Sequence, residues 1–208
     1  MKIYDISRSI SPQTAVWTGD EPFSYEMILQ LQNDDSVNLT RIRLSPHTGT
    51  HADAPYHVSD SGIHPDKLPL EKYIGVAQVV SIERRHGGIV PDDIQHAITD
   101  PVKRLLIHSW ISENPDHEFH EDFPYPTVEL IDWLADQGAV LLGMDSPSVD
   151  AYTSKDLPGH HRLRERGMVW LETLCLKGVP DGKYELIALP LKIAEICGSP
   201  VRAILREI

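Results

Sequence analysis

The sequence predicts a mixed α/β fold in which strands outnumber helices. Three observations lead to this prediction: short alternating or continuously apolar runs recur, one stretch has helical periodicity with a cap and a stop, and a strand follows that helix. The chain has 208 residues, enough for a substantial hydrophobic core without a disulfide or a structural zinc. We expect a single domain over 1–208.

The predicted strands are spread along the whole chain. They cover residues 3–7, 24–32, 37–44, 76–82, 104–110, 140–144, 184–189 and 201–206. Turn residues separate the first strands at Ser11-Pro12 and at 18–22. The runs 76–82 and 104–110 are almost continuously apolar, which is typical of strands buried on both faces.

Two segments are predicted to be helical. Thr127 is a plausible N-cap for a helix over 127–137, Ile131 and Leu134 lie on its apolar side, and Gly138 ends it. A second helical stretch is expected over 160–166, closed by Gly167.

Charge and cysteine content exclude several classes of protein. Nineteen basic residues face 31 acidic ones, and the net charge of −12 argues against binding to nucleic acids or anionic membranes. Asp5 interrupts any signal-peptide core, and no run reaches the roughly 20 apolar residues of a membrane span, so a cytoplasmic protein is expected. Cys175 and Cys197 are then expected to be reduced packing residues.

The segment 46–57 carries most of the chemistry. His47, His51, Asp53 and His57 fall within eleven positions. In an extended backbone all four would point to one face, whereas in a helical turn His47 and His51 would share a face. Gly49 lets the backbone bend between those two histidines. Either geometry brings two imidazoles and a carboxylate together.

Two imidazoles and a carboxylate leave open coordination positions, as a catalytic metal site needs. Zinc is the leading candidate and manganese the rival. Asp53 has two oxygens and could bridge to a second ion, for which His160, His161 and Glu172 are candidate ligands that spacing does not separate. A lone histidine is usually only solvated or hydrogen-bonded, but this density of ligand types favours a metal site.

The same segment resembles a known family. His-Thr-Gly-Thr-His-Ala-Asp-Ala-Pro-Tyr-His is similar to the H-x-G-T-H-x-D-x-P-x-H signature of the metal-dependent cyclase superfamily, and within it to the bacterial kynurenine formamidases (arylformamidases). Residues 16–20, Val-Trp-Thr-Gly-Asp, resemble the family's V-W-P-G-D, with Thr18 in place of proline. Residues 145–150 resemble its D-x-P-S-x-D segment, and His160-His161 and Leu171-Glu172 stand where its later ligands lie.

The resemblance implies a role for each matching residue. It implies a cyclase-like fold with a central β-barrel-like sheet flanked by helices, a homodimer, and two Zn²⁺ ions per subunit, with Mn²⁺ possible. The implied first-metal ligands are His47, His51 and Asp53, with Asp53 bridging to a second ion completed by His160 and Glu172. His57 would be the proton donor and acceptor, and Trp17 would contact an aromatic substrate.

The implied reaction is hydrolysis of N-formyl-L-kynurenine to L-kynurenine and formate, a step of tryptophan breakdown, by a metal-activated water. Two alternatives remain open. One is another amide hydrolysis within the superfamily, such as isatin ring opening. The other is a non-catalytic metal-binding or scaffold protein, which the presence of every ligand and of His57 disfavours.

Overall fold

A mixed sheet organises the protein, whose computed structural model describes residues 1–98 and 100–208. Within the described residues the sheet has nine strands in the order β1-β13-β11-β5-β7-β9-β10-β4-β12. The central strands β5, β7, β9 and β10 are parallel and the flanking strands antiparallel. The bounds are β1 Ile3–Asp5, β4 His51–Asp53, β5 Ile74–Ser81, β7 Arg104–His108, β9 Leu141–Met144, β10 Val169–Glu172, β11 Gly182–Ile187, β12 Gly198–Pro200 and β13 Ile204–Glu207.

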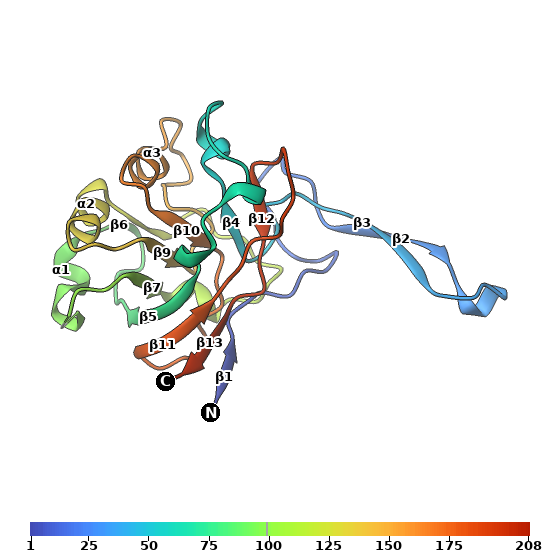
Figure 1. Ribbon diagram of the computed structural model, residues 1–208, viewed down its shortest axis with the longest axis horizontal. Coiled ribbons are helices and arrows are strands. Elements are labelled where there is room, and N and C mark those ends of the chain that lie inside the picture. Colours follow the sequence, from blue (N-terminus) through green and yellow to red (C-terminus); the bar gives the residue numbers. More distant parts are fainter. Residues whose placement is uncertain (99) are drawn as a thin grey trace.

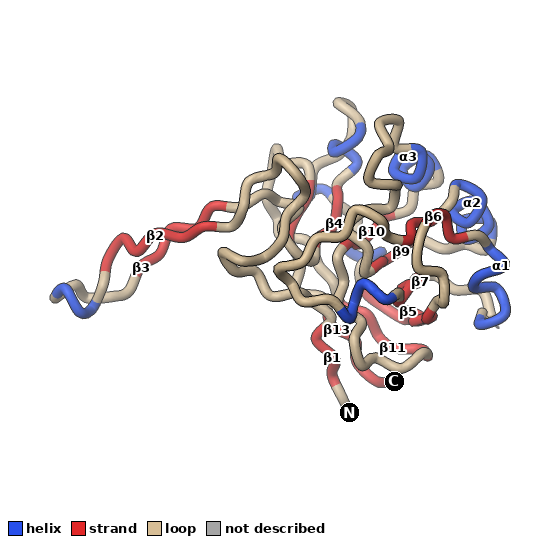
Figure 2. The backbone as a smooth tube through the Cα atoms, turned by 180° about the vertical axis from the view of Figure 1, so that it is seen from behind, coloured by secondary structure: helices blue, strands red, loops and turns tan. Residues whose placement is uncertain are grey.

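Smaller elements surround this sheet. The helices α1 (Pro91–Ile94), α2 (Val128–Asp136) and α3 (Pro158–Glu165) lie together on one side of it, as Figure 1 shows. Two short ribbons, β2 (Ser24–Leu29) with β3 (Leu39–Arg43) and β6 (Gly87–Ile89) with β8 (Pro124–Pro126), complete the strands. Loops and short 3₁₀ turns make the remaining connections (Figure 2); the turns are Leu31–Asn33, Pro55–Val58, Pro65–Lys67, Leu70–Lys72, Gln95–Ala97 and Trp110–Glu113.

Hydrophobic clusters cover both faces of the central strands. On β7, Leu106 packs into one cluster while Leu105 and Ile107 pack into the other. The second cluster includes side chains of α2 and α3, such as Leu134 and Leu163. Burial on both faces explains the continuous apolar runs of the parallel strands, as predicted.

Helix α2 forms where its local signals place it. The Thr127 hydroxyl accepts a hydrogen bond from the backbone N–H of Leu130, at 3.2 Å, so the predicted N-cap is confirmed. Gly138, at φ 87°, follows the helix in the left-handed conformation that glycine adopts most easily. Leu130, Ile131 and Leu134 are fully buried against the sheet.

The β2–β3 ribbon projects from the body as a long arm, most clearly in Figure 1. Both strands were predicted from their alternation, but the first ends at Leu29 and is followed by a 3₁₀ turn, so the predicted extension to residue 32 is wrong. Alternation predicts one buried face, yet Tyr25, Met27 and Ile42, which share a face, are 58%, 37% and 60% exposed. The apolar face of the arm therefore has no partner in the described part of this chain.

The fold class is confirmed, and the errors concern ends and short strands. Residues 3–7, 104–110 and 201–206 were predicted as strands, but these strands cover Ile3–Asp5, Arg104–His108 and Ile204–Glu207; the second helix begins at Pro158 and not at residue 160. Strands β4, β6, β8, β10 and β12 were not predicted, because alternation is a weak signal over only three or four residues. Strands β1, β9 and β13 are as short, but they overlap longer predicted runs. No helix among the described residues is both long and apolar enough to cross a membrane.

Candidate metal centre

Strand β4 brings the first candidate ligands into the sheet. Because side chains alternate along a strand, His51 and Asp53 point to the same face. The antiparallel register places His51 opposite Glu172 of β10, and Asp53 opposite Gly198 of β12. Sheet pairing thus brings Glu172 to His51 across 121 positions of sequence, which local spacing did not predict.

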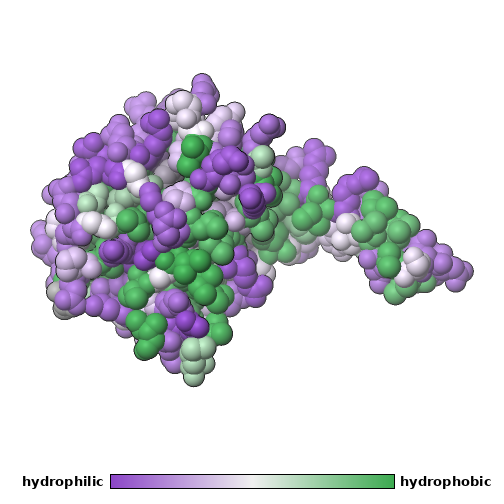
Figure 3. Space-filling view, in the orientation of Figure 1, coloured by the Kyte–Doolittle hydropathy of each residue, from purple (hydrophilic) through white to green (hydrophobic). Residues whose placement is uncertain are grey.

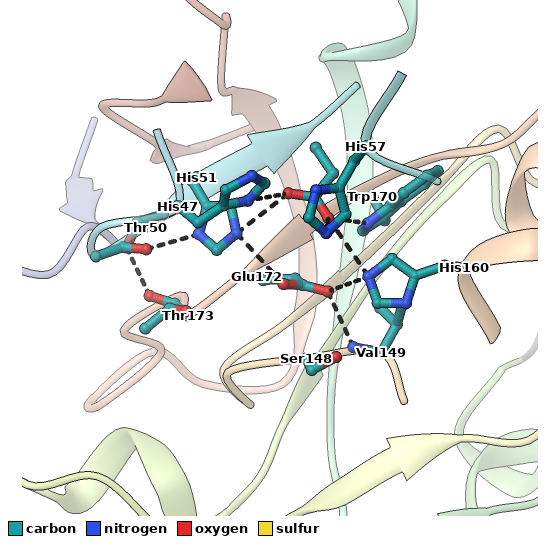
Figure 4. Close-up of polar contacts among 12 residues, drawn as sticks. His47, Thr50, His51, His57, Ser148, Val149, His160, Trp170, Glu172 and Thr173 are labelled. Atoms are coloured by element: carbon teal, nitrogen blue, oxygen red, sulfur yellow. Dashed lines mark hydrogen bonds and ion pairs between the residues drawn. The ribbon is translucent and has the colours of Figure 1, made fainter. Parts of the chain in front are cut away.

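The two oxygens of Asp53 face different histidines. Oδ1 lies 2.8 Å from Nδ1 of His47 and 3.2 Å from Nε2 of His51, while Oδ2 lies 3.4 Å from Nε2 of His160. The two oxygens of Glu172 also face different histidines: Oε2 lies 3.3 Å from Nε2 of His51, and Oε1 lies 3.5 Å from Nε2 of His160. Figure 4 shows these rings turned toward the carboxylates that lie between them.

Two buried atoms at this centre have no hydrogen-bond partner among the described residues, Nε2 of His51 and Oδ1 of Asp53. They lie 3.2 Å apart, and Oδ1 is also 2.8 Å from Nδ1 of His47, yet neither contact is aligned as a hydrogen bond. An uncompensated buried nitrogen and carboxylate oxygen would be costly, whereas a cation between them would satisfy both. The residues present therefore fit a divalent metal.

Helix α3 and the loop before it hold His160 in place. Nδ1 of His160 lies 2.7 Å from Oδ2 of Asp150, and the same carboxylate accepts the backbone N–H groups of Gly159 and His160. His160 is buried, but its neighbour His161 is exposed. The structure therefore brings His160, and not His161, to Asp53 and Glu172.

The motif 47–57 has a different conformation at each end. His47 lies in a turn, His51 and Asp53 lie on β4, and His57 lies in the 3₁₀ turn Pro55–Val58. The motif is therefore neither extended throughout nor folded into a helical turn between His47 and His51, although all four side chains converge. Nε2 of His57 is 3.9 Å from Oδ2 of Asp53, and its side chain is 32% exposed, against 1–6% for Asp53, His51, His160 and Glu172. His57 lies at the rim of the centre.

The electrostatics of the centre favour positive charge around Asp53. Burial alone lowers the pKa of His47, His51 and His160, but their carboxylate partners outweigh it and raise these pKa values to about 11, 9 and 10. Burial opposes the charge of Asp53 too, yet the histidines hold its pKa well below the usual range. Hydrogen bonds from His47 and His57 lower the pKa of Cys197 to about 6. A bound cation would take the place of the protons that charge His47, His51 and His160.

A cavity of about 600 Å³ opens onto the centre. His47, His51, His57, His160 and Glu172 all line it, and so does Trp17. The Trp17 ring is 4.8 Å from the ring of Tyr152, 5.6 Å from that of Phe119 and 6.5 Å from that of Phe123. Trp17 and Phe119 therefore give the cavity of the candidate metal ligands an aromatic surface, and Tyr152 and Phe123 pack against Trp17.

Three residues at the centre were missed or given no role from the sequence. Asp150 lay inside a recognised motif, but nothing local showed that it holds His160. Trp170 donates its Nε1–H to Oδ2 of Asp53 at 3.1 Å. Cys197 was interpreted as a packing residue, but its sulfur lies 3.1 Å from Nε2 of His47. The segment containing Cys197 reaches the centre only through sheet pairing, so no local signal could have placed it there.

The chain is similar to known proteins along its whole length. The chain is 44% identical to a kynurenine formamidase from Salinibacter ruber over 208 residues, covering all of this chain and 98% of the relative. A solved structure described as a potential metal-dependent hydrolase with cyclase activity is 28% identical, with a TM-score of 0.85 and coverage of 98% of this chain and 96% of the other.

Isatin hydrolase A from Labrenzia aggregata has the same fold at 25% identity, with a TM-score of 0.85 and coverage of 98% of this chain and 93% of the other. The sequence pattern of the cyclase family, described as "Putative cyclase", matches residues 4–151. The resemblance inferred from the motifs is therefore confirmed: this chain belongs to the cyclase family.

Proposed function

We propose that this protein is a metal-dependent arylformamidase that hydrolyses N-formyl-L-kynurenine to L-kynurenine and formate in tryptophan breakdown. The observation that carries the proposal is one cavity that is lined both by the histidine–carboxylate centre and by the aromatic rings of Trp17 and Phe119. An aryl formamide needs both parts, a centre for hydrolysis and a flat apolar surface for its ring. The 44% identical kynurenine formamidase supports the same substrate.

The proposed cofactor is a pair of Zn²⁺ ions, with Mn²⁺ as the alternative. Asp53 belongs to two separate candidate ligand groups, one with His47 and His51 and one with His57 and His160. We assign His160 and Glu172 to the second ion and keep His57 free, because His57 is the most distant from Asp53 and the most exposed. Bound zinc supplies Lewis acidity and lowers the pKa of water to about 7.

Side chains of the protein would transfer the proton and orient the substrate. His57, at the rim of the cavity, would pass a proton to the arylamine nitrogen as its bond to the formyl carbon breaks, because an imidazole can take up and release a proton near neutral pH. Trp17 would stack on the aryl ring and orient it toward His57. The formyl group is small, so the buried end of the site needs little free space.

An absorbance assay with N-formylkynurenine, run beside metal analysis, tests the proposal. We expect turnover that a chelator abolishes and that added Zn²⁺ restores. Isatin tested in parallel separates the alternative, which the similarity to isatin hydrolase A keeps in view. Turnover of isatin without turnover of the formamide would contradict the proposed substrate, and full activity in metal-free protein would contradict the proposed chemistry.

We also propose a homodimer, formed in part by the arm. Tyr25 lies opposite Ile42 across the ribbon, whereas Glu26 and Arg41 pair on the other face at 3.2 Å. The arm is thus an amphipathic ribbon with its apolar face exposed, and Figure 3 shows hydrophobic side chains along it. A lone two-stranded ribbon is only marginally stable in water, so contact with a second copy would stabilise it.

The reducing cytoplasm would suit the two free cysteines, and we propose that location.

Light scattering coupled to gel filtration tests the arm. Ile42→Asp places a charge on the apolar face and is expected to shift the dimer toward monomer. Arg41→Ser, on the polar face of the same strand, is the matched control and should leave the dimer intact. If Ile42→Asp stays dimeric at the same concentration, the arm is not the interface.

A further inference from the structure

Two of the proposed ligand imidazoles are held by their second ring nitrogen. Nδ1 of His51 lies 2.8 Å from the carbonyl oxygen of Gly49, and Nδ1 of His160 lies 2.7 Å from Oδ2 of Asp150. A partner of this kind accepts the Nδ1–H, fixes the tautomer, and leaves Nε2 free to bind a metal. In both residues Nε2 is the atom that faces Asp53 and Glu172.

His47 is turned the other way round. Its Nδ1 lies 2.8 Å from Oδ1 of Asp53, and its Nε2 lies 3.1 Å from Sγ of Cys197. In each ring, the nitrogen that faces away from Asp53 has a partner: a carbonyl oxygen for His51, a carboxylate oxygen for His160 and a sulfur for His47. Sulfur is a weak hydrogen-bond acceptor as a thiol and a stronger, charge-assisted one as a thiolate.

The fold fixes the sulfur at this position. The carbonyl of Cys197 accepts the N–H of Ala54 at 2.9 Å, immediately before β12 pairs with β4. The next residue, Gly198, lies against the His47 ring so closely that a Cβ there would be 2.8 Å from Cε1 of His47. The ring is therefore confined between the backbone of residue 198, the Asp53 carboxylate and the Cys197 sulfur.

We propose that Cys197 is a positioning residue for the metal centre: its sulfur accepts the Nε2–H of His47 and holds the imidazole with Nδ1 toward Asp53, where a metal ion would bind. The inference rests on the metal centre of the proposed function but not on its substrate. It assigns Cys197 to the chemistry of the site through His47, and not to coordination of the ion. The bound ion would thus keep an imidazole and carboxylate ligand set, with the sulfur one step removed.

The test compares three full-length variants by their affinity for Zn²⁺ in competition with a chromogenic chelator. Cys197→Ala removes the acceptor and should weaken Zn²⁺ binding about 10–100-fold, the usual effect of losing an outer partner of a ligand histidine. Cys197→Ser restores an oxygen acceptor and should recover most of that loss. Cys175→Ala is the matched control at the other free cysteine, outside the cavity lining, and should bind as the wild type does.

Cobalt spectroscopy separates positioning from coordination. The Co²⁺-loaded wild type should show no thiolate-to-cobalt charge-transfer band in the near ultraviolet, and Cys197→Ala should shift the visible d–d bands as His47 loses its orientation. A charge-transfer band that Cys197→Ala abolishes would make Cys197 a ligand and overturn the proposal. Equal Zn²⁺ affinity in Cys197→Ala and the wild type would overturn it too. Neither result depends on formamide turnover, so the proposed substrate stands or falls separately.

Discussion

The β4–β10 pair and the β2–β3 arm are both short antiparallel pairings, but their surroundings are opposite. Every residue of β4 and β10 is buried, while in the arm every residue except Leu29 is exposed. The buried pair holds the carboxylates of Asp53 and Glu172, and the arm presents apolar side chains to solvent. In each strand pair the residues that suit their surroundings least carry our proposals: buried carboxylates at the proposed metal centre, and exposed apolar side chains on the arm of the proposed dimer.

The largest effect is expected from Asp53→Asn, which removes the charge shared by the histidines. A neutral amide cannot replace the charged carboxylate that faces both ligand groups, so metal content should fall. The value of kcat/KM should drop by more than roughly 100-fold, the upper limit typical of losing a residue that only hydrogen-bonds to a metal ligand. Glu26→Gln on the arm changes a 65% exposed carboxylate in the same way and is the control. Unchanged metal content in Asp53→Asn would show that the buried pair is not the metal centre.

A smaller and more selective effect is expected from His57→Gln. The side chain lies at the rim, so metal content should remain at the wild-type level while kcat falls about 10²–10⁴-fold through loss of proton transfer. The pH–rate profile should lose one limb at the same time. Turnover at the wild-type rate would remove His57 from the chemistry.

Metal binding should also depend on pH in a direction set by the histidines. In metal-free protein the pKa values of His47, His51 and His160 are raised to about 11, 9 and 10, so all three are protonated at pH 7. Their contribution to folding is fully present below about pH 6.5 and is lost as pH rises through 9 to 11. Zn²⁺ must displace these protons, so its affinity should rise from pH 6 to pH 8.

Calorimetry in two buffers of different ionisation enthalpy measures this proton release directly. The metal-free protein should also lose thermal stability above about pH 9, where the first histidine deprotonates, while the zinc-loaded protein should not. Zinc binding without proton release at pH 7 would show that the raised pKa values do not describe the metal-free centre.

The smallest effect on the centre is expected from the arm. Tyr25→Ser on the exposed ribbon should change the free energy of unfolding of a single chain by no more than about 0.5 kcal/mol. Zinc affinity, measured by chelator competition, should stay at the wild-type value. A marked loss of zinc from Tyr25→Ser would mean that the arm and the β4–β10 pair are energetically coupled and do not behave as independent regions.

Much of the helical structure and the first part of the site could be predicted because their signals are local. Thr127 caps α2 within the helix it begins, and Gly138 ends it. His47, His51, Asp53 and His57 lie within eleven positions, so their convergence follows from the chain itself.

The rest depended on pairings between distant segments. Register between β4 and β10 brings Glu172 to His51, and β12 brings Cys197 to His47, over 121 and 150 positions. Strands as short as β4 and β12 carry little pattern of their own, and no longer predicted run overlaps them. The alternating pattern of the arm predicts which face is apolar but not what covers it. The sequence by itself determined the fold class, the capped helix and the ligand-rich motif. Only the tertiary structure decided which distant side chains complete the centre, because long-range pairing is set by the packing of the whole sheet and not by neighbours along the chain.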